Sequence, residues 1–98
     1  MDSPQTPLTL RLYVSGQALN SRAAIRNLEA LRELLSDAVA VEVVDVRERP
    51  ELAEEDRILA TPTLVRLTRT PVRKIIGDLS DTERVLMRLE IESPGNTG

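Results

Sequence analysis

In the first half of this chain the spacing of the hydrophobic residues changes from every second position to helical spacing. This change constrains the possible fold more than any other feature of the sequence. Apolar residues occupy every second position over 8–14, which predicts a strand with one buried face. Over 21–36 they recur at helical spacing, with Asn20 or Ser21 as the expected N-cap. The nearly continuous β-branched run over 39–46 predicts an interior strand. This strand–helix–strand order predicts two parallel neighbouring strands joined by a right-handed crossover.

The second half predicts four shorter elements. Pro50 stands at a favourable first helical position, and acidic residues follow it where they favour the helix dipole. Ser80 and Glu83 match a capping box, which predicts the start of a last helix. The expected elements are a helix over 50–59, strands over 64–67 and 72–77 joined as a hairpin by a turn at 68–71, and a helix over 80–91.

The stretch 59-LATPTLVRL-67 places Pro62 directly before the third strand. A cis proline at this point, in a β–α–β–α–β–β–α order, resembles the thioredoxin-like arrangement. We therefore expect an α/β, thioredoxin-like fold in which a cis Pro62 locks the third strand. The chain contains no cysteine, so the usual redox chemistry of that arrangement is missing. Fold alone assigns no function.

Composition narrows the function classes further. The chain has no histidine, so it lacks the commonest general base and metal ligand. Its net charge of −3 and the absence of a basic tail argue against nucleic acid as a partner. It has neither an apolar run long enough for a membrane span nor a signal-peptide pattern, so we expect a cytoplasmic protein. Residues 1–7 and 92–98 are expected to be disordered tails around one domain over 8–91.

The residues leave two enzyme-like alternatives. Ser15 and Tyr13 could activate a glutathione thiol, but Ser15 and Gly16 are more simply a turn. A metal could bind the carboxylates of the second helix, although their spacing matches no known oxygen-ligand motif. The simpler interpretation is a solvated helix face, formed by Glu51, Glu54, Glu55 and Asp56. No catalytic residue, metal ligand or cofactor is therefore assigned.

Four stretches carry a resemblance to a known family. They are 10-LRLYVSGQALNS-21, 43-VVDV-46, 51-ELAEEDRILATPTLVRL-67 and 71-PVRKIIGDLSDTERVL-86. They resemble the KaiB family of circadian clock proteins, and the match covers about residues 8–91. The resemblance implies a non-enzymatic protein that binds the N-terminal ATPase ring of the KaiC hexamer. It also implies capture of KaiA and displacement of the histidine kinase SasA.

The resemblance also implies an alternative fold and a set of contact residues. In the family's resting form, a homo-oligomer that is often a tetramer and otherwise a dimer, the N-terminal β–α–β half is kept and the C-terminal half is rearranged. The KaiC-facing positions correspond to Arg47, Arg49, Pro50, Glu51 and Arg57, with Arg66, Pro71, Arg73 and Lys74 on the hairpin. The KaiA-facing positions correspond to Ala40 and Glu42, with Arg22 or Ala23 nearby. The fold-switch positions correspond to Pro62, Arg88 and Glu90.

Departures from the family pattern leave the partner open. Glu42 stands where typical cyanobacterial members have a basic residue, which puts KaiA capture in doubt. Arg88 replaces a usual glycine and Glu90 lies where an aspartate is usual, so Arg88 is expected to favour the thioredoxin-like form. The alternatives are a KaiB-like protein with another signalling or stress-response partner, and a detached sensor domain like that of SasA.

Overall fold

The computed structural model describes residues 8–35 and 39–91. The predicted tails, 1–7 and 92–98, and the last predicted residue of the first helix lie outside the described residues. The element order is the expected β–α–β–α–β–β–α. The elements are β1 (Leu8–Val14), α1 (Leu19–Leu34), β2 (Val39–Asp45), α2 (Pro50–Glu55), β3 (Thr63–Arg66), β4 (Arg73–Ile76) and α3 (Thr82–Arg88).

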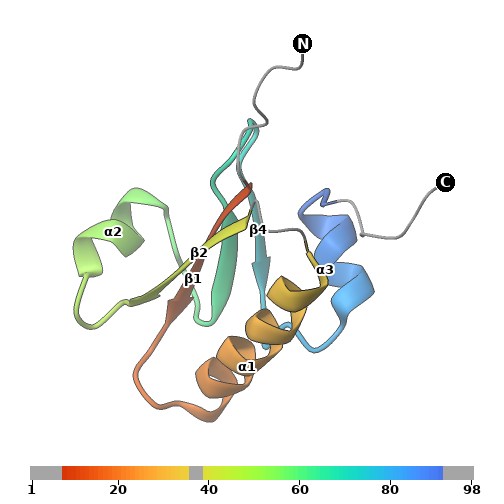
Figure 1. The fold of residues 1–98 in the computed structure, drawn as a ribbon. Coiled ribbons are helices and arrows are strands. Elements are labelled where there is room, and N and C mark those ends of the chain that lie inside the picture. The colour runs from red at the N-terminus through yellow and green to blue at the C-terminus, as the bar shows by residue number, and fades with distance from the viewer. Residues whose placement is uncertain (1–7, 36–38, 92–98) are drawn as a thin grey trace, which may run out of the picture.

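The four strands form one mixed sheet in the order β2-β1-β3-β4. Strand β1 runs parallel to β2 and antiparallel to β3, which in turn pairs antiparallel with β4. Helices α1 and α3 cover one face of this sheet, and α2 lies on the other (Figure 1). The parallel pair, the hairpin and the cis bond between Thr61 and Pro62 are all confirmed. A second cis bond joins Thr70 to Pro71 in the loop of the hairpin.

Alternation along the strands separates two apolar clusters. Side chains of β1 that pack toward α1 and α3 join a core that is entirely aliphatic, formed by Leu10, Leu12, Val14, Ala24, Leu28, Leu31, Leu64, Ile75, Leu79, Val85 and Leu89. The opposite side of the sheet carries a smaller cluster of Tyr13, Val44 and Val65, on which Leu52 and Ala53 of α2 pack. The second cluster fixes α2 in place, although α2 has only six residues.

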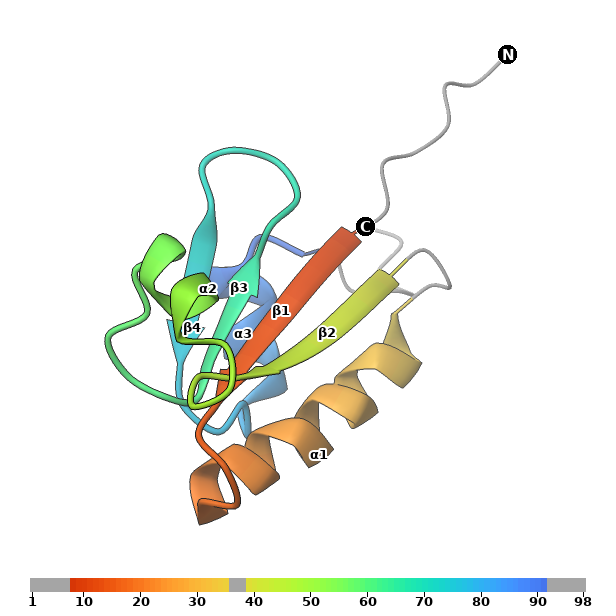
Figure 2. The same cartoon turned by 90° about the vertical axis from the view of Figure 1, so that its left-hand side faces the viewer.

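The position of β2 differs from the prediction. Strand β2 is an edge strand of the sheet and not an interior one, and Figure 2 shows it beside β1 at the sheet's border. The sequence of β2 is mostly apolar because each face of this strand is partly covered by one of the two apolar clusters. Val39 and Val41 pack against the larger core, whereas Val44 belongs to the smaller cluster. Val43 remains 46% exposed, as an edge position allows.

Both predicted N-caps are wrong. Helix α1 starts at Leu19 after Ala18, which makes no side-chain cap hydrogen bond. The Ser21 hydroxyl, in the first turn of the helix, instead accepts a hydrogen bond from the Ser15 backbone N–H at 3.1 Å. Helix α3 is capped by the Asp81 carboxylate, which accepts from the Arg84 N–H at 3.1 Å. The S-x-x-E pattern marked the right region, but the true cap lies one residue later.

Helix α2 is shorter than predicted. It ends at Glu55, and Arg57 has a positive φ of 55°, which is incompatible with a continuing right-handed helix. Ile58 then turns back to the smaller cluster and donates its backbone N–H to the Ala53 carbonyl at 2.9 Å. The remaining predicted residues of this helix form the link that leads to Pro62.

Candidate protein-binding surface

The loop between β2 and α2 is held by one carboxylate. Asp45 accepts hydrogen bonds from the Gly16 N–H at 3.2 Å and from the Arg47 N–H at 2.9 Å. The Arg47 guanidinium donates to the same carboxylate from Nε at 3.3 Å and from its terminal nitrogen at 3.2 Å. These bonds, the Arg47 side-chain bond above all, lower the pKa of Asp45. The loop therefore presents Arg47 in a defined position, although its side chain is 64% exposed.

Gly16 is required by the same arrangement. Its φ is +54°, and a Cβ atom there would lie 2.5 Å from the guanidinium carbon of Arg47. A side chain at position 16 would therefore displace Arg47, and it would also be strained in its own backbone. The turn predicted at Ser15–Gly16 thus supports the loop between β2 and α2.

Helix α2 begins with a second exposed ion pair. Arg49 Nε donates to a Glu51 carboxylate oxygen at 2.8 Å, on either side of Pro50 at the first helical position. This side-chain hydrogen bond is the main cause of the lowered pKa of Glu51. Both side chains are more than half exposed. The loop and the start of α2 therefore display a fixed pattern of charges, which we call the α2 surface: Arg47, Arg49, Pro50 and Glu51.

A polar network beneath α2 was not predicted. The buried Tyr13 donates its hydroxyl to the Asp56 carboxylate, which also accepts from Arg11 at 3.1 Å. Arg11 Nε donates to Glu42 on β2 at 2.9 Å. The pKa of Tyr13 is raised, first because burial disfavours the phenolate and then because of the hydrogen bond to Asp56. The network ties β1, β2 and the end of α2 together.

Lys74 of β4 connects the hairpin to the same region. Its ammonium donates to the backbone carbonyl of Asp56 and, at 3.4 Å, to that of Arg57. These carbonyls lie just past the end of α2, where they lack intrahelical partners. Lys74 therefore acts as a C-terminal clamp for α2, and Arg57 stays exposed beside it.

The other basic residues of the hairpin divide between interior and surface. Arg66 is 1% exposed and donates to the Leu89 carbonyl at 2.6 Å and to the Pro71 carbonyl at 2.9 Å. It therefore serves the fold and is not accessible to a partner in this arrangement. Arg73 donates to Glu90 at 2.9 Å, and Pro71 is exposed in the loop.

The positions expected to face KaiA lie on different layers. Ala40 and Glu42 are exposed on the edge strand β2, and their register with Thr9 and Arg11 places them on the α2 side of the sheet. Arg22 is exposed on α1, which covers the opposite face, and its neighbour Ala23 is half-buried. The structure therefore does not bring Arg22 together with the two β2 residues on one face.

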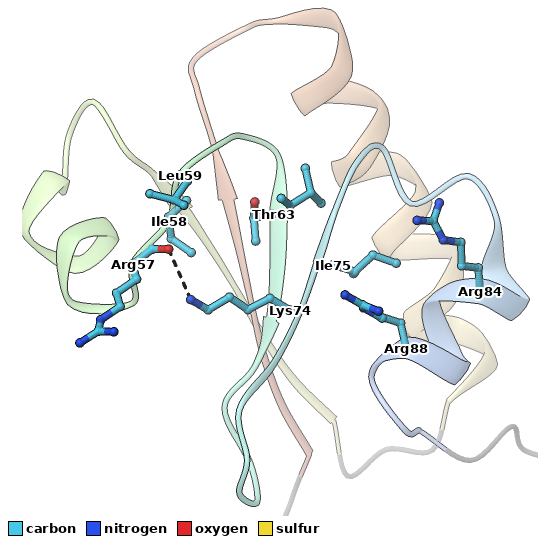
Figure 3. Close-up of a pocket in the computed structure, with 9 residues that line it drawn as sticks. Arg57, Ile58, Leu59, Thr63, Lys74, Ile75, Arg84 and Arg88 are labelled. Carbon is cyan, nitrogen blue, oxygen red and sulfur yellow. Dashed lines mark hydrogen bonds between the residues drawn. The ribbon is translucent and has the colours of Figure 1, made fainter.

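A pocket also lies at the open edge of β4 (Figure 3). It has a volume of about 430 Å³ and is lined by Arg57, Ile58, Leu59, Thr63, Lys74, Ile75, Ile76, Arg84 and Arg88. Four of these residues are cationic and none is acidic. Sequence reasoning assigned Arg57, Lys74 and Arg88 to other roles and did not single out Arg84, because α3 is brought beside β4 only by the fold.

The structure also places the residues of the two enzyme-like alternatives. The hydroxyl of Tyr13 is engaged by Asp56 and its side chain is 0% exposed, which argues against activation of a bound thiol. Across residues 8–35 and 39–91, no group of three or more acidic side chains is arranged to hold a metal. In the same ranges, no helix has the length and hydropathy needed to cross a membrane.

Comparison with known proteins decides the family. The family model described as the KaiB domain matches residues 11–91. The circadian clock oscillator protein KaiB of Acaryochloris marina is 51% identical over 93% of this chain and 88% of its own length. That of Synechococcus elongatus is 49% identical over 91% of this chain and 88% of its own.

The chain belongs to the KaiB family.

Membership in the KaiB family confirms the expectation of a non-enzymatic clock-type protein. Solved structures confirm the thioredoxin-like arrangement. The N-terminal domain of Synechococcus elongatus SasA has a TM-score of 0.71 at 23% identity and covers 92% of this chain and 90% of its own. The thioredoxin Deadhead of Drosophila melanogaster has a TM-score of 0.72 at 18% identity and covers 85% and 80%. At these identities the likeness concerns the fold alone.

Proposed function

We propose that this KaiB-family protein docks on the N-terminal ATPase ring of a KaiC-type hexamer and thereby modulates the ring's phosphorylation state and its signalling. The observation that carries the proposal is the α2 surface. Its charged side chains are exposed, yet each is held by an ion pair, with Arg47 on Asp45 and Arg49 on Glu51. A preorganised charge pattern of this kind favours recognition, because little side-chain entropy remains to be lost on binding.

A charge swap tests the α2 surface. The double variant Arg49→Glu/Glu51→Arg keeps an ion pair at the start of α2 and leaves the net charge unchanged, but it reverses the order of the charges. We expect binding to the KaiC-type ring to weaken by at least about tenfold, because attractive contacts become repulsive ones. The measurement is native mass spectrometry of each variant mixed with the KaiC homologue of the same genome and ATP.

The matched control swaps an ion pair of α1. Arg32 and Glu29 lie 3.8 Å apart and are also more than half exposed, so Glu29→Arg/Arg32→Glu changes charge order away from α2. This control should bind like the unaltered chain. If the α2 swap bound the ring as tightly as the unaltered chain does, the α2 surface would be excluded as the docking site. No complex with the unaltered chain would favour the alternative of a different signalling or stress-response partner.

Further partners are proposed at the edge strand β2. Ala40 and Glu42 are exposed on this strand. They would form the surface that binds a KaiA-type protein or a component of a SasA-like histidine kinase pathway. Glu42 is paired with Arg11 at 2.9 Å, so the edge presents less free negative charge than the sequence alone suggests. We place the protein in the cytoplasm, where such signalling partners act.

We also propose that the thioredoxin-like form is in equilibrium with a resting homo-oligomer whose C-terminal half is rearranged. The variant Arg88→Gly tests this equilibrium. Arg88 closes α3, where a basic side chain favours the helix dipole and glycine costs about 1 kcal/mol of helix stability. A loss of this size changes a two-state ratio roughly fivefold. Light scattering after size exclusion should therefore show a larger oligomeric fraction for Arg88→Gly. An unchanged mass distribution would contradict the role of Arg88.

A further inference from the structure

The open edge of β4 is a second candidate docking site, separate from the α2 surface. Strand β4 pairs with β3 on one side only, so within the described residues its other edge has no strand beside it. The pocket of about 430 Å³ lies along this edge, between the link after α2 and helix α3 (Figure 3). An unpaired edge of this kind can accept an added strand through backbone hydrogen bonds.

One side of this edge carries two arginines that form no ion pair among the described residues. Arg84 and Arg88 are four residues apart on α3, so they share one helix face, and both are exposed. Neither takes part in any of the ion pairs found among the described residues, and Arg57 at the opposite rim is likewise unpaired. The pocket is therefore locally basic in a chain whose net charge is −3.

The other side of the edge exposes aliphatic side chains. Ile76 lies on the α2 side of the sheet, in register with Thr63, and it is 60% exposed. Leu59, in the link after α2, is 95% exposed and lines the same pocket. Exposed aliphatic side chains gathered beside an unpaired edge mark a surface for binding. On this side the ammonium of Lys74 is engaged by the backbone carbonyls of Asp56 and Arg57, and the Arg57 side chain lies at the rim. The two sides of β4 thus differ: the α3 side offers two arginines, and the link side offers mainly aliphatic side chains.

We propose that the β4 edge binds an extended segment of another protein in which acidic and apolar residues alternate, and that this segment adds a fifth strand to the sheet. Successive side chains of a strand point to opposite faces. The acidic residues of an added strand would therefore meet Arg84 and Arg88, and its apolar residues would meet Leu59 and Ile76. The proposal rests on Arg84, Arg88, Leu59 and Ile76, none of which belongs to the positions that the resemblance assigns to KaiC, although Arg57 and Lys74 line the same pocket.

Two labelled peptides of equal composition test this proposal. In the first, Asp or Glu alternates with Val over seven residues; in the second, the same acids stand in one block. Fluorescence anisotropy with the full chain should show the alternating peptide binding at least about fivefold more tightly, because only it matches both sides of β4. Amide hydrogen exchange of Lys74, Ile75 and Ile76 should slow when it binds.

Two sets of variants separate the cationic side from the apolar side. Arg84→Glu/Arg88→Glu should abolish binding, whereas Arg26→Glu/Arg32→Glu, an equal charge change on exposed positions of α1, should reduce it only slightly. Leu59→Ser, at a position with no structural burial, should weaken binding about threefold. Equal binding of both peptides without protection of β4, or no binding of either, would overturn the proposal.

Discussion

Replacing Arg66 with alanine is expected to lower the free energy of unfolding by about 2–4 kcal/mol. The Arg66 guanidinium joins three segments, because it lies on β3 and donates to the carbonyls of Pro71 in the hairpin loop and Leu89 at the end of α3. Glu90 lies 3.9 Å away and balances part of its charge. Alanine would leave both carbonyls without their donor and would open a cavity. Urea unfolding followed by circular dichroism measures the loss.

Two further variants sharpen the Arg66 measurement. Arg66→Met keeps most of the buried volume but not the donors, so its loss should lie between zero and that of Arg66→Ala. Arg26→Ala removes an exposed arginine of α1 and should change stability by less than about 0.5 kcal/mol. A loss below about 1 kcal/mol for Arg66→Ala would show that the carbonyls find other donors.

Replacing Tyr13 with phenylalanine is expected to cost about 1–2 kcal/mol at neutral pH. The ring would still fill the smaller cluster, but Asp56 would lose the hydroxyl that donates to it. Because Asp56 lies just past α2, we also expect the loss to loosen α2 against the sheet. Urea unfolding gives the stability, and amide hydrogen exchange in α2 gives the local effect. Unchanged exchange in α2 would contradict this role for the hydroxyl.

The cost of Tyr13→Phe is expected to shrink at alkaline pH. The pKa of Tyr13 is raised in the folded chain, so the unfolded chain loses this proton first as pH rises. The contribution of the neutral hydroxyl is therefore fully present below the ordinary tyrosine pKa of about 10 and is lost as pH rises through and above that value. The difference in unfolding free energy between the two chains should be constant from pH 7 to about 9 and then fall. A constant difference up to pH 11 would contradict the raised pKa.

Agreement between sequence and structure is best where a feature depends on local pattern. The alternation over 8–14, the proline before the third strand and the short turn of the hairpin all predicted the right element in the right place. Element ends were less accurate, because caps depend on single side chains. Ser80 matched a capping motif, yet Asp81 supplies the hydrogen bond.

The candidate site was predictable only in part. The resemblance placed Arg47, Arg49 and Glu51 in a partner-facing region, and the structure describes all three as exposed. The Tyr13–Asp56 bond joins residues 43 apart in sequence, so no local pattern could indicate it. The same holds for the pocket at β4, whose cationic side comes from α3.

By itself the sequence determined the types and order of the elements, because hydrophobic period and turn residues act over a few neighbouring positions. Only the tertiary structure decided that β2 lies at an edge, that Arg66 is buried and that Arg84 and Arg88 flank an open strand. A basic residue on a strand looks the same in sequence whether it faces water or the interior. Its role depends on which distant carbonyl or carboxylate the fold brings within reach.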